Sequence, residues 1–260
     1  MIYAGLDIGS VATKVVLWDG NVGRLAARAL RPSGWDPRQA GADCLQEALS
    51  AAELRREDLA GIVVTGYGRR LWPGPGETVT EITCLVRGGR EVAPAARTLF
   101  DIGGQDSKAL TVDAAGKLLQ FNVNDRCAAG TGRFLELAGQ RLGVTAAELG
   151  VLAASAESTV RLSSLCAVFA ESEVVGLLAE GQERSAIARG LCEAVAEQIL
   201  HLAGGLPLGR PVALVGGVAY NIGVRAALER ALGETVLVPE DPQMIVALGA
   251  ALLAAEGAQE

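Results

Sequence analysis

Two short stretches of the sequence share one pattern and decide the fold. Residues 7–14 read Asp-Ile-Gly-Ser-Val-Ala-Thr-Lys, and residues 101–108 read Asp-Ile-Gly-Gly-Gln-Asp-Ser-Lys. In both, an apolar run ends at Asp-Ile-Gly, a lysine follows seven residues after the aspartate, and a second apolar run comes next. An apolar run, a tight turn and another apolar run predict a β-hairpin. The repeat indicates two related halves.

Strands and helices are expected to alternate around these two hairpins. Short apolar runs predict strands, and apolar residues recurring every three or four positions predict helices. The expected strands are 2–6, 15–18, 61–65, 99–102, 109–112, 118–121, 212–215 and 236–238, and the expected helices include 37–52, 191–202, 223–232 and the segment after Pro242. This order predicts an α/β fold.

The repeat also suggests where the chain divides. We expect an N-terminal α/β subdomain over residues 1–95 and a C-terminal α/β subdomain over residues 96–260. The terminal helix is a candidate to pack back on the N-terminal subdomain. No low-complexity linker separates the halves, so the two subdomains are expected to share a cleft.

Composition excludes several classes of protein. Of the 260 residues, 50% are hydrophobic and 20% are charged, enough apolar material for a buried core. The longest apolar stretch, residues 244–255, is shorter than the ~20 residues of a membrane span, and Asp7 interrupts the first apolar run. The net charge is −7, with no block of Lys or Arg. A cytoplasmic protein without a membrane or nucleic-acid partner is therefore expected.

The two hairpin turns are candidate phosphate-binding loops. A glycine turn at a strand end presents backbone N–H groups that can cradle phosphate. The aspartate can hold Mg²⁺ through water. One such turn is more often purely structural, but two copies favour a nucleotide site. Neither a P-loop nor a complete GxGxxG motif is present.

A third glycine-rich segment follows the expected strand 212–215. Gly216 and Gly217 lead through Val218-Ala219-Tyr220-Asn221 into a helix. Side-chain-free residues allow the backbone to approach a ligand closely, and a helix N-terminus favours anions. The simpler interpretation is a tight strand-to-helix turn.

The five cysteines are the remaining candidates for chemistry. Their odd number and lack of a CxxC pair argue against a disulfide framework or a single-chain zinc site. Cys127 and Cys166 each precede a helical pattern, and a helix N-terminus stabilises a thiolate or an anionic metal cluster. Without further context such thiols are more often small buried residues, which is the interpretation for Cys44, Cys84 and Cys192.

Longer motifs supply that context. The three glycine segments resemble the phosphate-1, phosphate-2 and adenosine motifs of the acetate and sugar kinase/Hsp70/actin superfamily. Residues 124–136 (NDRCAAGTGRFLE) and 165–174 (LCAVFAESEV), together with DIGGQDSK and GGVAYN, resemble the ATP-dependent activators of 2-hydroxyacyl-CoA dehydratases. That family includes the ATPase subunits of benzoyl-CoA reductase. The resemblance implies two related α/β domains around an ATP cleft.

The same resemblance implies cofactors and partners. In that family, the cysteines matching Cys127 and Cys166 of two subunits hold one [4Fe-4S] cluster across a homodimer interface, which agrees with the four thiolates that a cubane takes. ATP hydrolysis, with Mg²⁺, drives one-electron transfer from a ferredoxin or flavodoxin donor to an iron–sulfur dehydratase. A double-cubane cluster protein is the alternative partner.

Residue roles follow from the motifs. Gln105, Asp7 and Asp101 are assigned to catalysis, and the two aspartates also to Mg²⁺ through water. The residues assigned to ATP or ADP are Gly9, Ser10, Thr13, Lys14, Gly103, Gly104, Gln105, Asp106, Gly216, Gly217, Ala219 and Asn221. Lys14 and Lys108 are also interpretable as solvated surface lysines. Tyr220 departs from the family, which commonly has an amide there.

Other functions remain open at this level. A sugar or small-metabolite kinase would need a carboxylate base, for which Asp106 or Asp125 are candidates, and would contain no iron. A nucleotide-controlled chaperone-like module is least favoured because no separate substrate domain is evident. His201 is expected as a packed helix residue. Glu171 and Glu173 either flank a cluster helix or form a solvated face.

Overall fold

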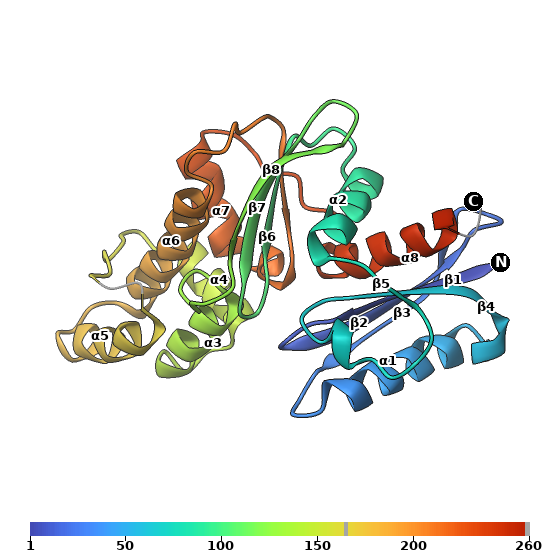
Figure 1. Cartoon of the computed structure of the whole chain (residues 1–260). Coiled ribbons are helices and arrows are strands. Elements are labelled where there is room, and N and C mark those ends of the chain that lie inside the picture. Colours follow the sequence, from blue (N-terminus) through green and yellow to red (C-terminus); the bar gives the residue numbers. More distant parts are fainter. Residues whose placement is uncertain (164–165, 258–260) are drawn as a thin grey trace. The chain divides into compact units, whose positions relative to one another are not determined.

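The structure is a computed structural model that describes residues 1–163 and 166–257 (Figure 1). The chain divides into two compact units. Unit 1 comprises Met1–Pro94 and Gln243–Glu260, and unit 2 comprises Ala95–Pro242. The terminal helix thus belongs to the same unit as the N-terminal strands.

Unit 1 is a five-stranded sheet with helices on both faces (Figure 1). Its strands, in the order β3-β2-β1-β4-β5, are β1 (Ile2–Ile8), β2 (Ala12–Asp19), β3 (Arg24–Pro32), β4 (Leu59–Thr65) and β5 (Glu77–Thr78), and its α-helices are α1 (Pro37–Ala51), α2 (Glu81–Val92) and α8 (Ile245–Gly257). The α1 face buries Leu6, Leu17 and Leu49. The α8 face buries Val16 and Ala247. Each such large aliphatic side chain contributes about 1.5–3 kcal/mol when fully buried.

Local signals explain where α1 begins. Asp36 is the N-cap, and its carboxylate accepts hydrogen bonds from the backbone N–H groups of Arg38 and Gln39, at 3.0 and 3.3 Å. Pro37 fills the first helical position, where a missing N–H costs nothing. The helix then packs on β1, β2 and β3.

Unit 2 is a four-stranded sheet packed against a group of helices (Figure 1). Its strands, in the order β8-β7-β6-β9, are β6 (Thr98–Ile102), β7 (Ser107–Val112), β8 (Leu118–Asn124) and β9 (Val212–Val215), and its α-helices are α3 (Gly132–Arg141), α4 (Ala146–Ala154), α5 (Ala167–Ala179), α6 (Arg184–Leu202) and α7 (Ile222–Leu232). The core gathers around the fully buried Phe100, Phe134 and Ile187. Asn122 joins β8 to α6 by donating to the Leu202 carbonyl at 2.8 Å.

The two sheets repeat the same pairing. In unit 1, β1 runs antiparallel to β2 and parallel to β4; in unit 2, β6 runs antiparallel to β7 and parallel to β9. Asp7 lies directly opposite Lys14, and Asp101 lies directly opposite Lys108. The predicted hairpins and the α/β class are confirmed. The seven-residue spacing between aspartate and lysine therefore arises because the two residues face each other across the hairpin.

Two sequence expectations about the elements of the fold were wrong, and several elements were missed. Residues 236–238 do not form a full strand; Leu237 makes one isolated bridge to Ala213, with its N–H bonded to the Val212 carbonyl at 2.8 Å. His201 lies in the last turn of α6 but is exposed rather than packed. Strand β3 was missed because most of its residues are exposed, so it has no long apolar run. Helix α2 was missed because it contains two adjacent glycines.

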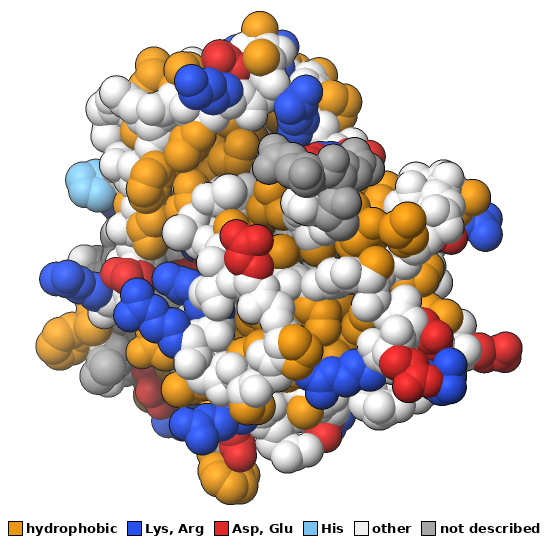
Figure 2. All heavy atoms as spheres, turned by 45° about the vertical axis from the view of Figure 1, so that its right-hand side comes forward, with side chains coloured by type: hydrophobic (Ala, Val, Ile, Leu, Met, Phe, Trp, Pro, Cys, Tyr) orange, Lys and Arg blue, Asp and Glu red, His pale blue; other side chains and the backbone are white. Residues whose placement is uncertain are grey.

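On the face in Figure 2, Lys and Arg side chains stand in small groups among acidic and apolar ones. None of the helices in residues 1–163 and 166–257 has the length and apolar character that a bilayer crossing demands.

Close helix packing in unit 1 depends on two glycines. A Cβ atom added at Gly249 of α8 would lie 1.8 Å from the Cys84 carbonyl oxygen of α2, and one added at Gly88 would lie 2.1 Å from the Ile245 carbonyl oxygen. Only glycine allows the two helices to cross this closely.

We expect Gly249→Ala to lower the free energy of unfolding by about 1–3 kcal/mol, because the helices must separate. The measurement is the urea midpoint followed by circular dichroism. Gly257→Ala is the matched control on the same helix, since a Cβ there meets nothing within 4 Å. An unchanged midpoint for Gly249→Ala would contradict this account of the crossing.

Candidate functional site

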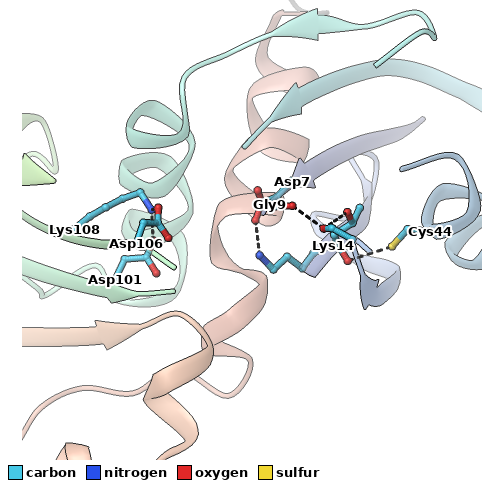
Figure 3. Close-up of polar contacts among 9 residues, drawn as sticks. Asp7, Gly9, Lys14, Cys44, Asp101, Asp106 and Lys108 are labelled. Atoms are coloured by element: carbon cyan, nitrogen blue, oxygen red, sulfur yellow. Dashed lines mark hydrogen bonds and ion pairs between the residues drawn. The ribbon is translucent and has the colours of Figure 1, made fainter. Parts of the chain in front are cut away.

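The first glycine turn, residues 9–11 between β1 and β2, lies beside a buried carboxylate. Asp7 is 2% exposed, and the Lys14 ammonium lies 2.9 Å from its Oδ2 atom (Figure 3). Among the described residues, its Oδ1 atom is buried without a hydrogen-bond partner. A buried anionic oxygen is costly to leave unsatisfied. Its chemistry fits Mg²⁺, held directly or through water.

A serine that the sequence analysis missed holds this turn. The Ser33 hydroxyl, which is buried, donates to the Gly9 carbonyl at 2.6 Å and lies 2.9 Å from the Thr13 hydroxyl. Because Ser33 has one proton, Thr13 is the donor of the second bond. The Thr13 hydroxyl is therefore used inside the turn, whereas Ser10 is exposed at its tip. No motif marks Ser33, which directly follows β3.

The second glycine turn, residues 103–106 between β6 and β7, repeats the arrangement. Lys108 is 3% exposed and its ammonium lies 3.4 Å from the Asp101 Oδ2 atom and 2.5 Å from the Asp106 Oδ2 atom (Figure 3). The Gly103 N–H donates to the Asp106 carbonyl at 2.9 Å and closes the turn. Gln105 is exposed at its tip.

The alternative interpretation of Lys14 and Lys108 as solvated surface lysines is therefore wrong. The side chain of Lys14 is 15% exposed and that of Lys108 is 4% exposed. Both lie in hairpins, where the cross-strand neighbour of each lysine is an aspartate. Each ammonium compensates the charge of a buried carboxylate.

A glycine faces each of these aspartates. Gly66 has φ +88°, and a Cβ there would lie 2.5 Å from the Asp7 Oδ1 atom; Gly216 has φ +85°, and a Cβ there would lie 2.5 Å from the Asp101 Oδ1 atom. Positive φ and lack of space both require glycine. Sequence analysis assigned Gly216 to a ligand loop and did not single out Gly66 as a site residue, but the structure gives both the same local setting.

The third glycine turn, residues 216–221 between β9 and α7, is fixed by Asn221. This side chain is 5% exposed; its Oδ1 atom accepts from the Val224 N–H at 3.0 Å, and its Nδ2 atom donates to the Ala146 carbonyl at 2.6 Å. It is thus an N-cap that also ties the turn to α4. Ala219 is buried and Tyr220 is 52% exposed.

The five thiols fall into two groups. Cys127 and Cys166 are exposed, whereas Cys44, Cys84 and Cys192 are buried. Burial raises the pKa of each buried thiol to about 12. Their chemistry is that of small packed side chains, because a protonated thiol is a poor nucleophile and metal ligand.

The exposed thiols lie near two helices that pack together, α3 and α5. Cys166 is the N-cap of α5, as expected. Cys127 lies in the loop 125–131 rather than at the start of α3, whose N-cap is Thr131. The helix-dipole argument therefore applies to Cys166 and not to Cys127, because the effect fades within one turn.

Contacts around α5 involve both glutamates that the sequence left undecided. The Arg141 Nε atom of α3 donates to the Glu171 Oε1 atom at 2.7 Å. The Glu173 Oε1 atom accepts from the Ser163 N–H at 2.6 Å. Ser164 and Leu165, which precede Cys166, lie outside the described residues. Across the described part of the chain, no three His, Cys, Asp or Glu side chains gather as a metal site.

Distant structures share the fold. A glucokinase of the ROK family from Streptomyces griseus superposes with a TM-score of 0.61 at 15% sequence identity, covering 99% of this chain and 100% of the kinase. This likeness confirms the predicted acetate and sugar kinase/Hsp70/actin-like fold.

Closer relatives narrow the family. The chain is 39% identical over 260 residues to a 2-hydroxyisocaproyl-CoA dehydratase activator of Clostridioides difficile, covering 100% of this chain and 97% of the relative. Component A of the (R)-2-hydroxyglutaryl-CoA dehydratase of Acidaminococcus fermentans superposes with a TM-score of 0.95 at 36% identity, with both chains fully covered. A dehydratase activator from Clostridium difficile with bound ADPNP superposes with a TM-score of 0.94 at 39% identity, covering 100% and 96% of the two chains.

The predicted resemblance is confirmed at the level of the whole chain. The model of the BadF/BadG/BcrA/BcrD ATPase family matches residues 4–254. With this match and relatives of nearly 40% identity over their full length, the chain belongs to the BadF/BadG/BcrA/BcrD ATPase family.

Proposed function

We propose that this ATPase drives one-electron transfer to a partner iron–sulfur protein, through a [4Fe-4S] cluster that two copies of the chain share. The observation that carries the proposal is the division of the thiols. Of the five cysteines, all of them among the described residues, only Cys127 and Cys166 are exposed, and the helices next to them pack together. Two thiols per chain become the four that a cubane requires when a two-fold axis relates two subunits.

The glycine turns are proposed to bind the nucleotide. Backbone N–H groups of the first and second turns, with Ser10 and Gln105 at their exposed tips, would contact phosphate oxygens or the attacking water. Asp7 and Asp101 would hold Mg²⁺ through water, and the orphaned Oδ1 atom of Asp7 supports this role. Lys14 and Lys108 would keep the carboxylates compensated while the metal is absent.

The remaining assigned residues have supporting roles in this proposal. Gly216, Gly217 and Ala219 would approach the nucleoside, and Asn221 would hold their turn in place through its bonds to Val224 and Ala146. Gly9, Gly103 and Gly104 would supply backbone contacts, with Thr13 and Asp106 fixing the turns from within.

The cluster would supply a low-potential electron carrier. In a one-electron step, each ~59 mV of extra reducing power costs about a factor of ten in equilibrium constant, so coupling to hydrolysis makes the transfer possible. The donor would be a reduced ferredoxin or flavodoxin. Relatives named as activators of 2-hydroxyacyl-CoA dehydratases favour such a dehydratase as the acceptor, with a double-cubane cluster protein as the other acceptor to test.

The structure offers little support for a kinase. Phosphoryl transfer to a hydroxyl needs a carboxylate base. Of the two candidates, Asp106 lies 2.5 Å from the Lys108 ammonium, and Asp125 is an exposed loop residue 4.0 Å from the Arg126 guanidinium. Neither is arranged as a proton acceptor in an enclosed site.

Anaerobic purification with iron analysis and native mass spectrometry tests the cluster. We expect a dimer with about two irons per chain, and loss of that iron in Cys127→Ser or Cys166→Ser. Cys192→Ser is the matched control and should keep its iron, because that thiol is buried. An iron-free monomer that phosphorylates a metabolite would refute the proposal.

Removing one carboxylate tests the Mg²⁺ assignment. Asp7→Asn should lower Mg²⁺-dependent ATPase activity by roughly 10–100-fold, the usual effect of losing an outer-shell metal partner. Titration with Mg²⁺ should show weaker dependence on the metal, whereas Asp43→Asn, a partly exposed aspartate on α1, should change neither quantity. Full activity in Asp7→Asn would contradict the assignment.

Alkylation tests the division of the thiols. In the folded, iron-free chain, iodoacetamide at pH 8 should label Cys127 and Cys166 only. With a pKa of about 12, the three buried thiols hold roughly a thousandfold less thiolate at that pH than an ordinary cysteine does. Mass spectrometry of the digested chain measures the labels, and urea should expose all five sites. Rapid labelling of Cys44 without urea would contradict the burial.

A further inference from the structure

The second glycine turn caps helix α3. The Gly132 N–H donates to the Gly103 carbonyl at 2.9 Å, and the Arg133 N–H donates to the Gly104 carbonyl at 2.8 Å. The first N–H groups of a helix lack partners within it, and here two of them use the carbonyls of the turn. The N-cap Thr131 makes no side-chain bond to the helix; its hydroxyl donates to the Ala128 carbonyl at 2.7 Å.

The same hairpin holds the loop that carries Cys127, the thiol loop (residues 125–131). The Ser107 hydroxyl, at the first position of β7, donates to the Gly130 carbonyl at 3.0 Å, and both groups are buried. At the end of β8, the Asn124 Nδ2 atom donates to the Cys127 carbonyl at 2.9 Å. Ser107 of the hairpin thus holds the end of the thiol loop, and Asn124, its cross-strand neighbour on β8, holds Cys127 itself.

A side chain at Gly132 would crowd the turn, so that the turn or the helix would have to shift by a few tenths of an ångström. A Cβ atom at Gly132 would lie 3.3 Å from the Gly103 carbonyl oxygen, 3.4 Å from the Gly104 Cα atom and 3.5 Å from the Val218 Cγ2 atom. Val218 belongs to the third glycine turn, so the start of α3 touches two of the three turns. A shift in the second glycine turn must move α3 or break two backbone hydrogen bonds.

The far end of α3 extends the connection. The Arg141–Glu171 ion pair joins the last turn of α3 to α5, the helix that begins after Cys166. Hydrogen bonds and an ion pair therefore connect Gly103 and Gly104 through α3 to α5, whose N-cap is Cys166.

From these contacts, we infer that Gly132 and Ser107 are positioning residues that transmit the nucleotide state of the second glycine turn to Cys127. This inference rests on the proposed function, because it assumes that the turn contacts phosphate. It assigns the coupling to two named contacts, Gly132 N–H to Gly103 carbonyl and Ser107 hydroxyl to Gly130 carbonyl. The proposed connection consists of hydrogen bonds within unit 2.

The test is the rate of Cys127 alkylation in the full chain, purified without iron and saturated with Mg-ADP or with Mg-ADPNP. We expect the two nucleotides to change that rate by about fivefold or more, the lower end of usual coupling between sites. Gly132→Ala and Ser107→Ala should bind both nucleotides normally and bring the ratio to within about twofold of unity.

Matched variants separate coupling from stability. Gly132→Ala improves helix propensity, so a purely structural role predicts no loss. Gly176→Ala makes the same change on α5, where a Cβ meets nothing within 4 Å. Thr98→Val removes an equally buried hydroxyl that bonds the Gly209 carbonyl from the first position of β6. Both controls should keep the ratio of the parent chain, and Ser107→Thr should restore it.

Two results would overturn the inference: no difference between nucleotides in the parent chain, or an undiminished ratio in a folded, nucleotide-binding Gly132→Ala chain. If Gly132→Ala fails to fold, Ser107→Ala decides alone, with Ser107→Thr as its rescue. The failure of the proposed function looks different. A chain that never acquires iron, yet shows nucleotide-dependent alkylation lost in both variants, would retain the coupling and refute the electron-transfer role.

Discussion

The rest of the structure depends on one constraint, the buried aspartate–lysine pair that joins β1 to β2 in unit 1 and β6 to β7 in unit 2. A carboxylate placed at the end of a buried strand is costly unless it is compensated. The hairpin solves this within itself, because its register puts a lysine on the neighbouring strand opposite the aspartate. The turn between the two residues must then be short, and its backbone stays accessible.

The same pair restricts the strand on the other side of the aspartate. The parallel neighbour strand, β4 in unit 1 and β9 in unit 2, ends at a glycine with positive φ, because a Cβ would collide with the aspartate Oδ1 atom. An aspartate, a lysine and a glycine therefore form one repeated unit. Beside each aspartate, the antiparallel strand begins and the parallel strand ends at the same edge of the sheet. The glycine turns therefore lie at that edge.

Much of this was predictable because it is local. The repeated Asp-Ile-Gly and the lysine spacing predicted both hairpins, and the long thiol motifs predicted the family. The contacts of Ser33 and Asn221 could not be predicted from local sequence, since their partners, Gly9 and Ala146, are 24 and 75 residues away. The burial of Lys108 was missed for a related reason: solvation depends on the segments that pack over a hairpin, and no local pattern encodes that packing.

The difference between the units explains why the two exposed thiols lie in only one of them. In unit 1 the connection from β3 to the parallel strand β4 contains one α-helix, α1. The equivalent connection in unit 2, from β8 to β9, contains α3, α4, α5 and α6, and both exposed cysteines lie within it. This longer connection starts directly beside the second glycine turn, whose carbonyls cap α3. The added helices are therefore bonded to the repeated unit at its glycine turn, and under the proposed function a nucleotide-dependent movement would have to reach them from there.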